Sequence, residues 1–258
     1  MSKIVSVHSF RGGTGKSNIT ANTSTTVAQR GFRVGVVDTD IQSPGIHVLF
    51  GLEDEQMDRT LNDFLWGKCP IEDAAYEMTA SVKAQMKGGG DFTGQVYLIP
   101  SSIKTSEIAK VLREGYDVSL LNEGFKALCN RMNLDYLFID THPGLNEETL
   151  LSIAISNALI LILRPDQQDF QGTAVTVEVA RKLDVERLLL VVNKVLTGFD
   201  FEAVRKQVES TYDAEVAGVL PESDDMIRLA SGGVFCMQNP DHQFSQTIRQ
   251  IADKLMEG

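Results

Sequence analysis

A glycine-rich segment near the start of the chain has the composition of a phosphate-binding loop. It reads Phe10-Arg11-Gly12-Gly13-Thr14-Gly15-Lys16-Ser17, and an apolar-periodic segment follows it to about Arg30. Glycines let the backbone curl so that successive N–H groups point at phosphate oxygens, and the start of a following helix adds a positive dipole. Lys16 would supply a point charge, and Ser17 would supply a hydroxyl ligand for Mg²⁺. The segment predicts a site for a nucleotide phosphate, although the standard G-x-x-x-x-G-K-[ST] loop would carry glycine in place of Phe10.

Two further segments place carboxylates directly after short apolar runs. Residues 34–37 lead into Asp38 and Asp40, and residues 136–139 lead into Asp140. Open α/β sheets bind ligands at the carboxyl edge of their strands, and phosphoryl transfer needs a carboxylate to hold Mg²⁺ or its water shell. We therefore expect these carboxylates to face the phosphates, although a D-x-D pattern before Pro-Gly is also common in turns.

The elements that must position these residues follow an alternating pattern. Apolar runs typical of buried strands occur at residues 4–7, 34–37, 96–99, 136–139, 159–163, 188–192 and, more weakly, 216–220. Between them lie helical patterns, in which apolar residues recur every three or four positions. Two examples are Val118, Leu121, Phe125, Leu128 and Met132, and then Ile248, Ile251, Ala252, Leu255 and Met256. Strands alternating with helices predict an α/β fold: a mostly parallel, twisted sheet of about seven or eight strands with helices on both faces.

The whole chain, residues 1–258, is expected to form one domain, because α/β folds often use this many residues in a single unit. The one linker-like stretch is Lys87-Gly88-Gly89-Gly90-Asp91-Phe92-Thr93-Gly94, where three consecutive glycines disfavour a packed backbone. We interpret residues 79–94 as a mobile insertion within the domain.

Composition narrows the classes of function. The chain is 43% hydrophobic with a net charge of −11, so general attraction to nucleic acid or anionic lipid would require a local basic patch. The three cysteines are far apart, which indicates neither a disulfide framework nor a self-contained metal site. No apolar run approaches a membrane span, and the first residues lack the pattern of a signal peptide. A cytoplasmic location fits these features best.

The glycine-rich segment resembles the deviant Walker A motif, [K]-G-G-x-G-K-[ST], of the MinD/ParA superfamily of ATPases. The resemblance extends from about Ser2 to Lys254 and implies the P-loop NTPase fold, with three α/β/α layers, ATP and Mg²⁺. In the superfamily the first lysine reaches the phosphates of the partner in an ATP-bound homodimer. Arg11 stands at that position here and keeps the charge with a different geometry. The resemblance thus implies catalytic roles for Lys16 and Arg11.

The loops that carry the carboxylates resemble the switch regions of this superfamily. By that resemblance Asp40 would orient the attacking water, Asp38 would lie near the metal, and Asp140 would be the Walker B aspartate. The metal ligands implied are Ser17, Asp38 and Asp140. In the superfamily the second switch region has the sequence D-x-P-P-G or D-S-P-A-G. The corresponding segment of this chain is Asp140-Thr141-His142-Pro143-Gly144. A lone histidine such as His142 is more often hydrogen-bonded or solvated than catalytic.

Two later segments resemble the part of the superfamily's site that holds the base. Asn193, after Val191-Val192, corresponds to an asparagine that contacts adenine, and Pro221-Glu222 correspond to residues lining the base on its other side. Asn193 could instead cap a turn. The full set of nucleotide-binding residues expected is Gly12, Gly13, Thr14, Gly15, Lys16, Ser17, Asn18, Asn193, Pro221 and Glu222.

The leading functional hypothesis is an ATPase whose ATP- and Mg²⁺-dependent homodimer recruits or positions a protein partner, and whose slow hydrolysis resets it. DNA binding is disfavoured by the net charge, and the last helical segment is near neutral, without a basic membrane-targeting extension. One alternative is a nucleotide-binding dimeric regulator with little hydrolysis. Another is an ATP-dependent small-molecule ligase or kinase of the related biosynthetic group, which would bind a substrate at the carboxyl edge.

Overall fold

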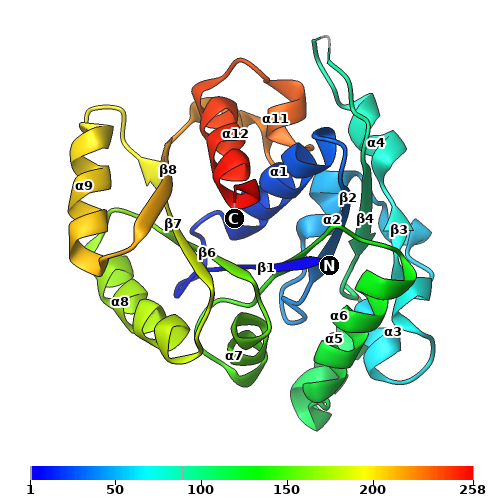
Figure 1. Cartoon of the computed structure of the whole chain (residues 1–258). Coiled ribbons are helices and arrows are strands. Elements are labelled where there is room, and N and C mark those ends of the chain that lie inside the picture. Colours follow the sequence, from blue (N-terminus) through cyan, green and yellow to red (C-terminus); the bar gives the residue numbers. More distant parts are fainter. Residues whose placement is uncertain (1, 89, 258) are drawn as a thin grey trace.

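Eight strands form one sheet in the computed structural model, which describes residues 2–88 and 90–257 (Figure 1). The strand order is β3-β4-β2-β5-β1-β6-β7-β8, and every pairing is parallel except that of β3 with β4. The strands are β1 Lys3–His8, β2 Arg33–Asp38, β3 Tyr76–Glu77, β4 Gln95–Ile99, β5 Tyr136–Asp140, β6 Ala158–Leu163, β7 Arg187–Val195 and β8 Glu215–Pro221. The predicted mostly parallel sheet is confirmed.

Helices cover both faces of the sheet. The α-helices are α1 Lys16–Gln29, α2 Ile46–Phe50, α3 Leu61–Leu65, α4 Thr79–Ala84, α5 Thr105–Glu114, α6 Ser119–Arg131, α7 Glu147–Ala154, α8 Gln167–Lys182, α9 Phe201–Tyr212, α10 Asp224–Leu229, α11 Phe235–Gln238 and α12 Gln243–Met256. Two 3₁₀ helices, η1 Asp54–Gln56 and η2 Ile71–Ala74, complete the set among the described residues. The helical patterns read from the sequence correspond to α6 and α12.

The core lies in two layers, because alternate strand residues face opposite sides of the sheet. On one side Val5, Val36 and Phe138 pack with α1 and α12. On the other side the cores are formed with α6 and with α8 and α9. Figure 1 shows α1 and α12 side by side over one face, with α7 and α8 on the other. Burial on both faces explains why the central strands are continuous apolar runs.

The segment 79–94, interpreted from the sequence as a mobile insertion, contains regular and packed structure. Helix α4 begins it and buries Thr79 and Val82, and Phe92 is buried near its end. The short strand β3, which sequence periodicity does not predict, precedes α4 and pairs with β4 at the edge of the sheet. Gly89, within the predicted glycine-rich loop, lies outside the described residues.

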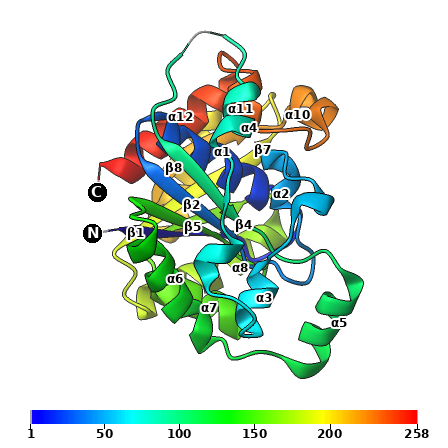
Figure 2. The same cartoon turned by 90° about the vertical axis from the view of Figure 1, so that its right-hand side faces the viewer.

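Helix α5 contributes little to the core. Only Val111 of this helix is buried, and Figure 2 shows α5 standing away from the sheet.

Within the described residues, no helix has the length and apolar character needed to cross a membrane.

Candidate functional site

The phosphate-binding loop joins the end of β1 to the start of α1 and is held by side chains of β7. Gly13 and Gly15 have φ values of 76° and 92°, which favour glycine. A Cβ atom on Gly15 would lie 2.5 Å from Asn193 Nδ2. Asn193 Nδ2 donates a hydrogen bond to the Thr14 carbonyl at 2.7 Å, and Lys194 Nζ donates to the Gly13 carbonyl at 2.9 Å. These contacts fix the curl of the loop and its distance from β7.

Lys16, the first residue of α1, is buried and paired with a carboxylate. Its Nζ donates to Asp140 Oδ1 at 3.0 Å, and the Thr20 hydroxyl, one turn further along α1, donates to the same oxygen at 3.0 Å. The contact joins the loop after β1 to the end of β5, its neighbour in the sheet. Lys16 is therefore positioned at the carboxyl edge beside the predicted Walker B aspartate.

Asp38 and Asp140 lie opposite each other in the pairing of β2 with β5. Burial, and next the negative charge of Asp140, raises the pKa of Asp38 to about 7. Asp38 accepts hydrogen bonds from the backbone N–H groups of Asp40 and Gly45, at 3.0 and 3.2 Å. Asp140 Oδ2 is buried without a hydrogen-bond partner among the described residues. Two buried carboxylates with an unsatisfied oxygen form a site suited to a hard cation.

The predicted metal ligands therefore fit Mg²⁺ by their chemistry. Ser17 follows Lys16 at the start of α1 and would add a hydroxyl oxygen. The described residues contain no group of three or more His, Cys, Asp or Glu side chains able to hold a metal ion. Mg²⁺ commonly binds through one or two protein oxygens together with water and substrate phosphates, so such a cluster is not required.

Asp40 lies in the loop after β2 and contacts the loop after β5. Its Oδ1 accepts a hydrogen bond from His142 Nδ1 at 2.7 Å, and both side chains are mostly covered, with 14% and 24% exposed. The same oxygen accepts from the Ser43 hydroxyl at 3.0 Å. The two loops that resemble switch regions are thus joined through the carboxylate predicted to orient water.

Arg11 is directed toward the beginning of α8 and away from the Lys16–Asp140 pair. Its guanidinium lies 3.9 Å from Asp166 and 3.9 Å from Asp169, and it donates a hydrogen bond to Gln168. The Arg11 side chain is 40% exposed. The structure thus separates Arg11 from the cluster of Lys16, Asp38, Asp40 and Asp140.

A cavity of about 350 Å³ adjoins the phosphate-binding loop on its other side. Its lining includes six residues that are predicted from the sequence to contact nucleotide: Gly13, Gly15, Asn18, Asn193, Pro221 and Glu222. Met226, Ile227 and Phe244 add apolar surface of the kind that a purine base contacts. The cavity lies where the strands β7 and β8 end, so a base placed in it would be next to the loop that holds its phosphates.

The comparisons with known proteins agree with this geometry. A family model described as an AAA domain (AAA_31) matches residues 2–196, about three quarters of the chain. The chain belongs to this family. The expected resemblance to the MinD/ParA superfamily of P-loop ATPases is confirmed at the level of family and fold.

Relatives from archaea align over nearly the whole chain. An uncharacterised ATP-binding protein of Methanocaldococcus jannaschii is 28% identical over 257 residues, covering 99% of this chain and 88% of that protein. The cell division ATPase MinD of Pyrococcus furiosus has a TM-score of 0.80 at 25% identity, covering 100% of this chain and 99% of the other. The septum site-determining protein MinD of Pyrococcus horikoshii, complexed with Mg-ADP, has a TM-score of 0.78 at 25% identity, with coverage of 99% and 96%.

Several residues of this P-loop site were not identified from the sequence. Thr20 is one helical turn after Lys16, so the (i, i+4) spacing could have indicated it. Ser43 is three residues after Asp40 on the same loop, so this short spacing could also have indicated it. Lys194, Met226 and Phe244 carry no such local signal, because the segments they approach are distant in the chain.

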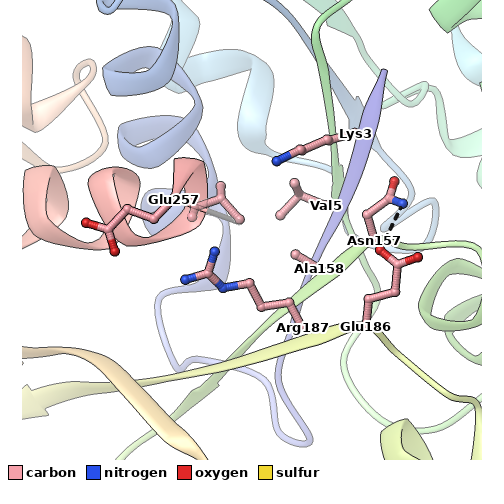
Figure 3. Close-up of a pocket in the computed structure, with 8 residues that line it drawn as sticks. Lys3, Val5, Asn157, Ala158, Glu186, Arg187 and Glu257 are labelled. Atoms are coloured by element: carbon pink, nitrogen blue, oxygen red, sulfur yellow. Dashed lines mark hydrogen bonds between the residues drawn. The ribbon is translucent and has the colours of Figure 1, made fainter. Parts of the chain in front are cut away.

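A second cavity, of about 490 Å³, lies at the opposite edge of the sheet, near the amino ends of β1, β6 and β7 (Figure 3). Lys3, Arg187, Glu186 and Glu257 surround it, and Val5 lies in its wall. Charges of both signs line it, and its residues are separated from the phosphate-binding loop by the length of the strands. It is not part of the nucleotide site.

Proposed function

We propose that this protein hydrolyses ATP slowly in the presence of Mg²⁺, and that two ATP-bound copies associate to recruit or position a protein partner. The observation that carries the proposal is the meeting of Lys16, Asp38, Asp40 and Asp140 at one edge of the sheet, beside a cavity of base size. Membership of a family of P-loop ATPases supports the same chemistry.

We assign each residue of the site a separate role in phosphoryl transfer. The loop amides and Lys16 would hold the β- and γ-phosphates, and Asn193, Pro221 and Glu222 would place the base. Bound Mg²⁺ would offset phosphate charge, held through Ser17 and, directly or through water, Asp38 and Asp140. Asp40 would accept a hydrogen bond from the attacking water and orient it toward the γ-phosphate.

Arg11 supports the dimeric part of the proposal. It is exposed at the edge of the site, and its contacts with Asp166 and Asp169 are long. A guanidinium in this position can exchange such contacts for the phosphates of a second copy, where it would neutralise developing charge. Hydrolysis would then remove the γ-phosphate and with it part of the attraction between the two copies.

The test is the rate of ATP hydrolysis against protein concentration, measured beside the oligomeric state with ATP and with ADP. The proposal expects a low ATPase rate per protein molecule that rises with protein concentration. It also expects a dimer with ATP and no dimer with ADP. A dimer without turnover would favour the regulator described above. Turnover that requires an added metabolite would favour the ligase or kinase, and a monomeric protein with a constant specific rate would contradict the dimer.

A further inference from the structure

The contact between His142 and Asp40 is a feature of the site that family resemblance does not explain. The superfamily pattern has no histidine at this position of the second switch. In this chain, His142 Nδ1 lies 2.7 Å from Asp40 Oδ1. Because a carboxylate oxygen accepts, the Nδ1–H donates, and hydrogen bonds to a charged acceptor at this distance are among the stronger ones in proteins.

The donors to Asp40 all converge on one of its two oxygens. Oδ1 accepts from His142 Nδ1, from the Ser43 hydroxyl at 3.0 Å and from the Ser43 backbone N–H at 3.3 Å. No described residue donates a hydrogen bond to Oδ2. The carboxylate is therefore oriented through one oxygen, and its other oxygen is left to accept a hydrogen bond from water.

The histidine is itself held in place from the other side of its loop. Its carbonyl accepts a hydrogen bond from the hydroxyl of Thr149, a buried residue of α7, at 3.2 Å. Two residues further on, the N–H of Gly144 donates to the Ser9 carbonyl at 3.2 Å, next to the phosphate-binding loop. These two contacts hold the backbone of the loop that carries His142 between α7 and the segment before the phosphate-binding loop. An imidazole on a backbone held in this way can set the orientation of a group on a neighbouring loop.

We propose that His142 is a positioning residue for Asp40: it holds the carboxylate through Oδ1 so that Oδ2 faces the water that attacks ATP. The proposal rests on the proposed function, in which Asp40 orients that water. Ser43, on the same loop as Asp40, fixes the carboxylate relative to its own backbone. His142 fixes it relative to the end of β5, where the Walker B aspartate lies.

A merely structural role for His142 would give a different result from a positioning role. If the contact only holds two loops together, its loss weakens ATP binding and stability and leaves the rate of the bound complex unchanged. If it orients Asp40, its loss lowers kcat and leaves KM nearly unchanged, since misplacing a reacting group costs up to about 100-fold in rate.

The experiment compares kcat and KM for ATP in the full chain and in the variants His142→Ala, His142→Asn and His142→Gln. Asparagine places its Nδ2 close to the position of histidine Nδ1, whereas glutamine places its donor one bond further out. We expect His142→Ala to lower kcat by about 10-fold to 100-fold with KM changed less than about twofold. His142→Asn should recover most of kcat and His142→Gln little of it, and Ser43→Ala should give a smaller loss than His142→Ala.

Asp40→Asn, measured for ATP binding and turnover, separates this inference from the proposed function. If Asp40→Asn binds ATP without turnover and His142→Ala keeps the parental kcat, the positioning role is wrong and the proposed function stands. A raised KM with unchanged kcat in His142→Ala also overturns the positioning role. If Asp40→Asn hydrolyses ATP at the parental rate, the role of Asp40 in the proposed function is wrong.

Discussion

The ion pair of Lys16 and Asp140 contributes to the stability of the fold and places a positive charge where phosphates would bind. Their contact, at 3.0 Å, is almost fully buried, with side-chain exposures of 8% and 1%. Removing one partner of a buried ion pair leaves an unpaired charge and typically costs about 3–5 kcal/mol. The ammonium that balances Asp140 is also the charge that would meet the phosphates. A variant at Lys16 therefore has two effects, which must be measured separately.

We predict that Lys16→Ala abolishes ATP binding and lowers the thermal unfolding temperature. Lys16→Gln should also lose ATP affinity but retain more stability, because its amide can still donate a hydrogen bond toward Asp140. Calorimetric titration with ATP gives the affinity, and thermal unfolding gives the stability. ATP affinity at the parental level in a folded Lys16→Gln protein would show that the phosphate site lies elsewhere.

Helix α8 is the element that accommodates the departure of the loop from the standard phosphate-binding pattern. Gly172 is buried in this helix, and a Cβ atom there would lie 2.1 Å from Cδ1 of the Phe10 ring. Glycine in a helix normally costs about 1 kcal/mol relative to alanine. The close contact explains why glycine is required here, since the aromatic ring at the start of the loop occupies the space of its side chain.

We predict that Gly172→Val displaces Phe10, lowers stability by about 1–3 kcal/mol and weakens ATP binding, because the start of the loop moves with the ring. Adding Phe10→Ala to Gly172→Val should restore part of the stability. Val175→Ala, on the same helix but 47% exposed, is the matched control and should change little. Chemical denaturation and ATP titration measure these effects, and an unchanged ATP affinity in Gly172→Val would contradict the coupling of α8 to the loop.

At the scale of the whole molecule, the proposed function requires a dimer in which Arg11 of one copy would contact the phosphates bound to the other copy. We predict that Arg11→Ala keeps the ATP affinity of the monomer, weakens ATP-dependent dimerisation and suppresses hydrolysis. An arginine supplied to a partner's phosphates is worth about 10³–10⁵ in rate where it is fully used. Arg11→Lys should recover part of both properties, because it retains the charge and loses the planar fork. Sedimentation and ATPase rates against protein concentration test this, and an unchanged rate in Arg11→Ala would refute catalysis across the dimer.

The stability of the whole molecule should depend on pH through His8. Burial, and next the positive charge of Lys16, lowers the pKa of His8 from 6.5 to about 3. Between these values the unfolded chain binds a proton at this residue and the folded chain does not. The free energy of unfolding should therefore fall by roughly 1 kcal/mol per pH unit as the pH decreases from 6.5 toward 3. Above pH 6.5, where His8 is neutral in both states, this loss is absent.

The matched variant for this effect is His8→Asn, whose amide can replace the hydrogen bond of His8 Nδ1 with the Thr141 hydroxyl. Denaturation curves at pH 7.5 and pH 5 should show the parent losing stability relative to the variant at the lower pH. Parallel pH profiles for the two proteins would mean that His8 does not titrate on unfolding.

The sequence by itself determined the order along the chain of the main strands and helices, and the edge of the sheet at which the candidate site residues lie. Burial on both faces requires continuous apolar runs, and parallel strands bring their carboxyl ends to one edge. Lys16, Asp38 and Asp140 were therefore expected at the same edge once the runs before them were recognised as strands, and their direct contacts follow from β2, β5 and β1 being neighbours in the sheet. The roles assigned to these residues remain predictions.

Only the tertiary structure decided the contacts between loops and the short elements at the edge. Strand β3 has two residues and forms because β4 offers a partner, so it has no periodicity of its own. The contact between His142 and Asp40 joins positions 102 residues apart, and Arg11 turns toward α8, 157 residues away at Gln168. A local sequence pattern indicates the conformation of its own segment. These contacts depend instead on the order of the strands in the sheet and on the conformation of each loop, and both are set by packing over the whole chain.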